Sequence, residues 1–449
     1  MPMSVIDIPL EPARHVHCLA LPGFVWAGSL GFARIVVMRD KDLYAQILGI
    51  QHPWMVREVD LDLEGGEVCV HVCYDPQCAL RCPECGEEAP GYDSRERRWR
   101  HLDTCQYRTI LVAEVPRCRC PDHDVRQVKV PWAEPGSRFT ALFESLVIDW
   151  LREASMAAVS RRLGVSWDQI DGIMHRAVDR GLERREEISP KHIGIDETSF
   201  KKRHRYVTVV QDQETGNVLH VAEGRSSEGL DDFYESLDEK GVSEIESVSM
   251  DMHQPYVQST LNHVLGAEEK ICFDKFHVAQ HLGNAVDKVR REEHKELLGE
   301  GDDTLKGTKY LWLRNPEKMK EEDWTFLKVL REYALRTARA WALKEMAMTL
   351  WDYVKRGWAM KAWKAWLSWA QRCRLDPMCK VAKTVKRHLW GIINAIVLKR
   401  NNARCESLNT KIQKLKKWAC GYRNPKRFKT IILFHLGGLD LYPARTRLS

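Results

Sequence analysis

The sequence lacks a long uninterrupted apolar run. Residues 18–38 form the one apolar stretch near a terminus, and Pro22, Arg34 and three glycines interrupt it. The stretch is short for a membrane span, and it lacks the basic start and small-residue cleavage site of a secretory signal. These absences disfavour a membrane protein and a secreted protein. Met38 begins a segment with a helical apolar pattern, so we predict that residues 1–37 are a poorly ordered upstream extension.

Acidic residues are almost absent between Lys380 and Lys429. Glu406 is the only one, among fifteen lysines and arginines. A basic face that is merely solvated tolerates several acids, so a single carboxylate has two interpretations. It is an internal salt-bridge partner, or it binds a metal ion where a nucleic acid approaches. The net charge is +6, with further bases at 95–100 and 201–205, which favours surfaces for phosphate backbones.

The fourteen cysteines are not spread along the chain as in a disulfide-bonded secreted protein. Eight of them fall between Cys69 and Cys120, which favours metal binding in a reducing compartment. Two knuckles, Cys82-Pro-Glu-Cys85 and Cys120-Pro-Asp-His123, each supply two ligands on a tight turn, as one tetrahedral, structural Zn²⁺ requires. Four further cysteines are possible substitutes or plain core residues: Cys73, Cys78, Cys105 and Cys118.

The region around these cysteines is predicted to consist mainly of β-strands. A helix over Asp40–Leu48 precedes a hairpin formed by Val56–Leu63 and Glu67–Cys73. More strands follow to about Val130, and prolines with Gly136 mark a boundary. The intervening sequence SRERRWRHLD is basic with a central tryptophan, which is consistent with phosphate contact.

Residues 139–185 are predicted to form three helices, the last two in a helix-turn-helix. Ala157, Ala158 and Leu163 are expected to face inward, Gly164 to make the turn and Ser166 to cap the following helix. The alternative is an ordinary helical hairpin. The basic flank favours DNA binding, and the predicted contact residues are Arg161, Arg162, Ser166 and Gln169.

From His192 the pattern changes to strands and helices in the order β-β-β-α-β-α-β, which is that of a ribonuclease H-like fold. Asp196 is expected to end the first strand and Asp251 the fourth, so that both carboxylates project from one edge of the sheet. Glu406, on a later helix, is the candidate third acid. Three oxygen ligands suit Mg²⁺ or Mn²⁺, and two such ions would activate the attacking hydroxyl and stabilise the leaving oxygen in phosphoryl transfer.

Each acid also has a plainer interpretation. Asp196 could cap its strand beside Glu197, and Asp251 could start the turn into the next helix. Asp274 is a rival second acid, ranked lower because the fifth strand should lie farther from the first than the fourth does. Asp274 and His277 lie three residues apart, and they could hydrogen-bond to each other or support the metal site from outside its ligand shell.

Residues 276–398 are predicted to be almost entirely helical and contain nine of the sixteen tryptophans. An aromatic helical core is the preferred interpretation, and base stacking is the alternative. A basic helix over Asn402–Trp418 follows and carries Glu406. Its predicted DNA contacts are Arg404, Lys411, Lys414 and Lys417. Basic residues 201–205 are either a backbone clamp or a solvated turn.

Together these segments resemble the ISL-three family of bacterial insertion-sequence transposases, which belong to the DDE, ribonuclease H-like group. The resemblance runs from about Met38 to the C-terminus. It rests on KDLYAQILGI, CPEC, CPDH, SMAAVSRRLGVS, IGIDETSFKKRHRYVTVV, MDMHQPY, FDKFHVAQHL and NNARCESLNTKIQKLKKWACGYRNPKRFKT, in that order. It implies catalytic Asp196, Asp251 and Glu406, a helical insertion before Glu406, and an accessory D-x-x-H motif at Asp274 and His277.

The expected architecture is a multidomain α+β protein. Its segments are an extension at 1–37, a zinc-binding DNA-recognition domain at 38–135, a helix-turn-helix at 136–188, a ribonuclease H-like core at 189–287, a helical insertion at 288–398, and the last helices of the core at 399–449.

The expected activity is strand cleavage and strand transfer at the terminal inverted repeats of an insertion sequence. Double-stranded DNA is the expected partner, with a homodimer that brings two element ends together and no membrane association. The resemblance implies a cytoplasmic, nucleoid-associated protein. Two alternatives remain: a ribonuclease H-like nuclease, and a DNA-binding repressor derived from a transposase that has lost an acid.

Overall fold

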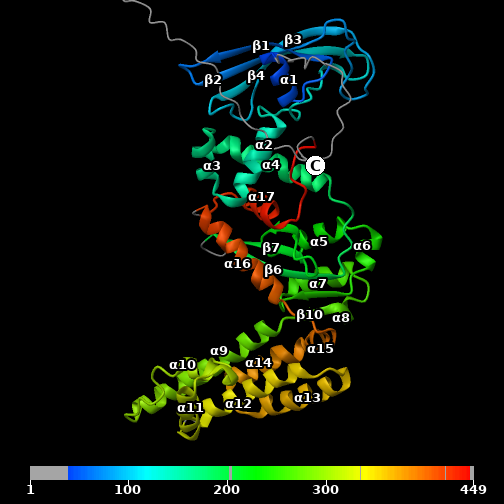
Figure 1. The fold of residues 1–449 in the computed structure, drawn as a ribbon. Coiled ribbons are helices and arrows are strands. Elements are labelled where there is room, and N and C mark those ends of the chain that lie inside the picture. The colour runs from blue at the N-terminus through cyan, green and yellow to red at the C-terminus, as the bar shows by residue number, and fades with distance from the viewer. Residues whose placement is uncertain (1–38, 202–204, 334, 420, 445–449) are drawn as a thin grey trace, which may run out of the picture.

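The structure is a computed structural model that describes residues 39–201, 205–333, 335–419 and 421–444. The predictions for residues 1–37 and for 202–204 lie outside these ranges. The described chain forms a β-rich part, a helical part next to a second sheet, and a larger bundle of helices at the opposite end (Figure 1). No helix in these ranges is both long and apolar enough to span a bilayer.

The N-terminal part is a five-stranded sheet next to one helix. The predicted hairpin is present, since β1 and β2 pair antiparallel. The sheet order is β1-β2-β4-β3, and β5 pairs with β4. Trp54 and Trp99 each pack edge-to-face against Trp132, which gives this small domain an aromatic core. The elements are α1 (Asp40–Ile47), β1 (Trp54–Asp62), β2 (Glu67–Tyr74), β3 (Gly91–Arg100), β4 (Arg108–Cys120) and β5 (Asp124–Gln127).

Three helices follow: α2 (Ala141–Glu153), α3 (Met156–Leu163) and α4 (Trp167–Glu183). Gly164 is left-handed between α3 and α4, with φ of 64°, a conformation that glycine adopts readily. Ser166 and Gln169 form a reciprocal capping box at the start of α4, as the predicted cap requires.

The inward face of α3 differs in part from the prediction. Leu163 packs against the core as predicted, but Met156 and Val159 are the buried residues, whereas Ala157 is exposed and Ala158 is only half-buried. The larger apolar side chains occupy the contact with the neighbouring helices because they bury more apolar surface than alanine does.

The second sheet has the order β10-β9-β6-β7-β8. β6, β7 and β8 pair antiparallel, whereas β9 and β10 run parallel to β6. One face packs against α5 and α7 through residues such as Ile195 and Phe233. The other face packs against α2–α4, α16 and α17 through residues such as Val209 and Ile432. The elements are β6 (His192–Lys201), β7 (Arg205–Asp212), β8 (Val218–Glu223), α5 (Glu228–Glu235), α6 (Glu239–Ser243), β9 (Ser247–Met250), α7 (Gln254–His263), α8 (Ala267–Lys270), β10 (Ile271–Phe273), α16 (Ala403–Trp418) and α17 (Pro425–Leu436).

Asp196 does not end the first strand, contrary to the prediction. It pairs with Val209 in the middle of β6, and the strand continues to Lys201. The strand extends because Thr198 and Phe200 are buried on the face toward α17, so alternating burial persists beyond Asp196.

The region between β10 and α16 is helical. Trp312, Trp363 and Trp366 are fully buried among its apolar residues, so the predicted aromatic core is present. The elements are α9 (Lys275–Gly299), α10 (Lys309–Leu313), η1 (Pro316–Lys318), α11 (Glu321–Tyr333), α12 (Leu335–Thr349), η2 (Leu350–Asp352), α13 (Arg356–Arg372), α14 (Asp376–Arg387) and α15 (Leu389–Leu398).

A glycine in β6 lets α16 pack closely on the sheet. A Cβ at Gly194 would lie 2.3 Å from the Cys405 sulfur of α16. Cys405 is buried, and the next residue along the helix is Glu406. The close approach of helix and strand therefore fixes the position of Glu406 relative to β6.

Candidate active site and zinc cluster

Three neighbouring strands bring acidic residues together. Because β9 and β10 run parallel to each other and to β6, the residues that follow β9 and β10 lie beside the middle of the longer β6. Asp251 follows β9 directly, and Asp274 follows β10 and begins α9. Asp196 lies within the adjacent β6, and α16 crosses that strand with Glu406 in its first turn.

Asp251, Asp274 and His277 form the tightest group. Each offers a ligand atom, and these atoms lie within 4.8 Å of one another. The His277 Nε2 is 2.6 Å from Asp251 Oδ1, and the His277 backbone N–H donates to Asp274 Oδ2 over 3.3 Å. Asp274 therefore lies in the cluster, although it was ranked below Asp251. The predicted contact between Asp274 and His277 exists through the backbone, while the imidazole is directed at Asp251.

Asp196 and Glu406 flank this group. Asp196 Oδ1 accepts the Glu197 N–H, and its Oδ2 accepts from Asn409 Nδ2, each over 2.8 Å. Glu406 is exposed and interacts electrostatically with Asp274, His277 and Asp251. Within the described ranges it forms no ion pair with a lysine or arginine, so the salt-bridge interpretation has no partner there.

The pKa values of Asp196, Asp274 and Glu406 are raised, as expected for desolvated carboxylates that lie close together. Burial, followed by the charge of Asp251, raises the pKa of Asp196 to about 7. Burial raises the pKa of Asp274, and burial followed by the charge of Asp274 raises the pKa of Glu406. Burial lowers the pKa of His277, but its contact with Asp251 outweighs that effect and the net direction is upward. A divalent cation would offset this charge, and carboxylate oxygens are the ligands that such hard cations prefer.

Two side chains that support the acids were not anticipated. Asn409 lies three residues after Glu406 on α16 and holds Asp196; its helical spacing from Glu406 was the available signal. Arg225 contacts Glu197, and burial raises the pKa of that glutamate despite the arginine. Nothing in the sequence indicated this pair, because Arg225 follows β8 and meets β6 only in the folded sheet.

The two cysteine knuckles meet as predicted. Cys82, Cys85, Cys120 and His123 have their ligand atoms within 4.8 Å of one another. The sulfurs of Cys85 and Cys120 are 3.7 Å apart, and the Cys120 sulfur is 3.5 Å from His123 Nδ1. A tetrahedral Zn²⁺ with ordinary bond lengths requires separations of about 3.8 Å between two sulfurs and about 3.6 Å between sulfur and nitrogen. The donors therefore fit a zinc ion. Cys118 is buried beside the cluster, and Cys105 is exposed.

The predicted DNA contacts are mostly exposed. Arg161 and Arg162 are exposed on α3, and Lys411, Lys414 and Lys417 are exposed along α16. Arg404 is also exposed, but its guanidinium donates to the Gln213 and Glu214 carbonyls and holds α16 against the turn between β7 and β8. Ser166 and Gln169 are engaged in capping α4.

A helix-turn-helix, a zinc cluster and a group of acids at one edge of a mixed sheet define a multidomain enzyme that acts on DNA. Comparison with known families gives the particular group. Residues 193–432 match a family model described as "Transposase", residues 128–178 match the "Helix-turn-helix domain of transposase family ISL3", and residues 79–123 match the "zinc-finger of transposase IS204/IS1001/IS1096/IS1165". The chain belongs to the ISL3 family of transposases and is a DNA transposase.

Curated relatives agree with this assignment. The chain is 29% identical over 434 residues to the "Transposase for insertion sequence element IS1557" of two Mycobacterium tuberculosis strains, covering 89% of this chain and 96% of theirs. It is 26% identical over 358 residues to the "Transposase for insertion sequence element IS1001" of Bordetella parapertussis, covering 78% of this chain and 86% of the relative.

Proposed function

We propose that this transposase binds the terminal inverted repeats of its element and catalyses strand cleavage followed by strand transfer with Asp196, Asp251 and Glu406. The observation that carries the proposal is the gathering of Asp251, Asp274 and His277, with Asp196 and Glu406 beside them, at one edge of the sheet. Two Mg²⁺ or Mn²⁺ ions bound there would activate the attacking hydroxyl and stabilise the leaving oxygen.

We further propose that the catalytic core is ribonuclease H-like. The support for this is a sheet of three antiparallel strands followed by two parallel strands, with helices on both faces. The proposed core comprises residues 189–287 and 399–449, with residues 288–398 as a helical insertion. The proposed zinc domain is 38–135 and the proposed helix-turn-helix is 136–188. The elements α1 to β5 lie within the first of these two ranges and α2 to α4 within the second, whereas α9 (Lys275–Gly299) runs across the proposed boundary between residues 287 and 288.

The protein's own side chains prepare the site. Asn409 fixes the orientation of Asp196 through its amide hydrogen. His277 holds Asp251, and this contact raises the pKa of the imidazole against the lowering effect of burial. Asp274 caps α9 and accepts the Asn402 N–H over 3.1 Å, which ties the start of α16 to the end of β10. Asp274 and His277 are therefore proposed as accessory residues that position the catalytic acids.

DNA is proposed to lie along exposed basic residues beside the site. Lys411, Lys414 and Lys417 follow one exposed face of the helix that carries Glu406. Cations on this face would hold the phosphate backbone near the acids. Arg161 and Arg162, with the first turn of α4, are the proposed recognition surface for the repeats. Two element ends must be joined, so the proposed assembly on DNA is a homodimer.

The test is product analysis with repeat-ended DNA, target DNA and Mg²⁺. The expected products are joined strands, because a 3′-OH exposed by cleavage attacks the target in line. Products that are cut but never joined would indicate a nuclease. Binding without any cutting would indicate a repressor. Either result would overturn the proposal.

The pH dependence of stability offers a separate prediction for the metal-free protein. The folded pKa of Asp196 is about 7, against an ordinary value of 3.8. Between these values the folded state binds the extra proton, so stability decreases as the pH rises. Asp196→Asn should therefore stabilise the metal-free protein at pH 8 by about 2 kcal/mol, allowing for screening by solvent.

The measurement is denaturant unfolding of the metal-free protein at pH 5 and pH 8. Asp303→Asn is the control, because the Asp303 carboxyl is exposed. The free energy of unfolding of the control should fall between pH 5 and pH 8 as much as that of the wild type. In Asp196→Asn this fall should be smaller. Identical pH dependence in the two variants would show that Asp196 is not the buried titrating group.

A further inference from the structure

A second group of metal-ligating side chains lies outside the acid site and the zinc knuckles. His52, Asp75 and Cys78 place one ligand atom each within 4.8 Å of one another. His52 precedes β1, while Asp75 and Cys78 follow β2. Because Trp54 pairs with Tyr74 in the antiparallel register, these flanking residues come together at the same end of the hairpin.

The hairpin end is held in place by the backbone. The Asp75 N–H donates to the Pro53 carbonyl over 2.7 Å, and the Cys78 N–H donates to the Asp75 carbonyl over 3.0 Å. Asp75 Oδ1 accepts the Gln77 N–H over 2.9 Å. This leaves Asp75 Oδ2 to face His52. The backbone therefore presents the carboxylate and the thiol on one short turn without requiring an ion to order them.

Both neighbours approach the same imidazole nitrogen. His52 Nε2 is 3.1 Å from Asp75 Oδ2 and 3.3 Å from the Cys78 sulfur. A cysteine-histidine-aspartate relay for nucleophilic catalysis would use the two different ring nitrogens. A single nitrogen carries either one proton or one lone pair. It therefore cannot donate to the Asp75 carboxylate and accept the Cys78 proton at the same time. A cation between the three atoms would satisfy all of them.

The distances suit a transition metal. Tetrahedral zinc requires about 3.3 Å between nitrogen and carboxylate oxygen ligands and about 3.6 Å between nitrogen and sulfur ligands. The observed separations are slightly shorter. A donor set of imidazole, carboxylate and thiol fits zinc or cobalt and does not fit magnesium.

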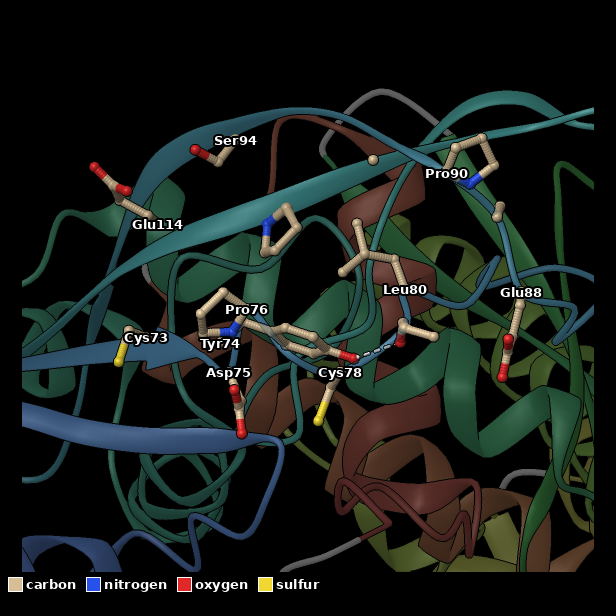
Figure 2. Close-up of a pocket in the computed structure, with 14 residues that line it drawn as sticks. Cys73, Tyr74, Asp75, Pro76, Cys78, Leu80, Glu88, Pro90, Ser94 and Glu114 are labelled. Atoms are coloured by element: carbon tan, nitrogen blue, oxygen red, sulfur yellow. Dashed lines mark hydrogen bonds between the residues drawn. The ribbon is translucent and has the colours of Figure 1, made fainter.

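The site is open to solution. The side chain of His52 is 66% exposed, and Asp75 and Cys78 line a cleft of about 710 Å³. In Figure 2, Asp75 and Cys78 lie close together with their side chains on the same side of the loop, whereas Cys73 lies farther along β2. The cleft leaves room for water as a fourth ligand.

We propose that His52, Asp75 and Cys78 bind a second zinc-class divalent ion, separate from the one at Cys82, Cys85, Cys120 and His123. The Cys78 thiol loses its proton to solvent as the sulfur binds the ion. The bound ion fastens the hairpin end to the loop that leads into the first knuckle. With three protein ligands it binds more weakly than the ion with four.

The test is a cobalt(II) titration of the full-length, metal-depleted protein, followed by thiolate-to-cobalt absorption. Ions held by carboxylates alone do not contribute to that signal, so the result is independent of the strand-transfer proposal. The expected end point is two cobalt ions per chain for the wild type. Cys78→Ser and His52→Gln should each reduce it to one.

Cys73→Ser is the matched control, because Cys73 lines the same cleft but lies outside the cluster. It should retain two ions. His52→Gln covers the case in which Cys78→Ser fails to fold, since His52 is largely exposed. An end point of one ion in the wild type, or equal losses in Cys73→Ser and Cys78→Ser, would overturn the proposal.

Discussion

Glu406→Gln is expected to reduce strand transfer by about a thousand-fold or more. The change removes one carboxylate oxygen from a proposed metal ligand. The ions at such a site would stabilise the transition state by several kcal/mol, and about 1.4 kcal/mol corresponds to a factor of ten in rate. The fold should survive, because Glu406 is exposed and the crowding of acids already disfavours its charge. The measurement is the rate of joining of repeat-ended DNA to target DNA with saturating Mg²⁺.

A measurement of DNA affinity distinguishes a loss of catalysis from a general loss of folding or DNA binding. Glu406→Gln removes a negative charge from a basic helix, so its affinity for repeat DNA should be unchanged or higher. Glu235→Gln is the control, since this exposed glutamate at the end of α5 lies in no metal-ligand cluster of the described chain. Joining by Glu406→Gln at the control's rate would refute the assignment of the third acid.

Cys120→Ser is expected to abolish zinc binding at the knuckles and to unfold the loops that they hold. Structural zinc contributes on the order of 10 kcal/mol in small domains. Here it would join the loop after β2 to the end of β4, where Cys82 and Cys120 form only a small buried cluster. Binding to the repeats should be lost with it. Limited proteolysis read by mass spectrometry should show new cleavage between residues 75 and 130.

The rest of the molecule serves as an internal control for protease resistance. The helix-turn-helix and the second sheet share a buried core that is separate from the core of the first sheet, so they should resist the protease in the same sample. Cys105→Ser is the matched control, because Cys105 is exposed and lies outside the cluster. Protease resistance of Cys120→Ser equal to that of Cys105→Ser would contradict a structural role for zinc.

Local sequence patterns were sufficient to predict much of the fold. The turn at Gly164 and the cap at Ser166 depend on backbone conformation and on neighbours three residues away, so the sequence predicted both correctly. The inward face of α3 was predicted correctly at Leu163 and wrongly at Ala157 and Ala158, because burial there depends on which side chains meet α2 and α4. The extent of β6 was also wrong, since the strand continues along a face covered by the distant helix α17.

The sequence by itself determined which residues are available for chemistry: the spaced cysteines, the acids after apolar strands and the lone glutamate of the basic segment. Spacing within a few residues is a local property, and it was sufficient to predict the two zinc knuckles. Only the tertiary structure decided the partners. Glu406 interacts electrostatically with Asp274 and His277, Asn409 holds Asp196, and His52 meets Cys78. These interactions join positions between 26 and 213 residues apart. Strand register and helix packing bring such positions together, and no local pattern encodes them.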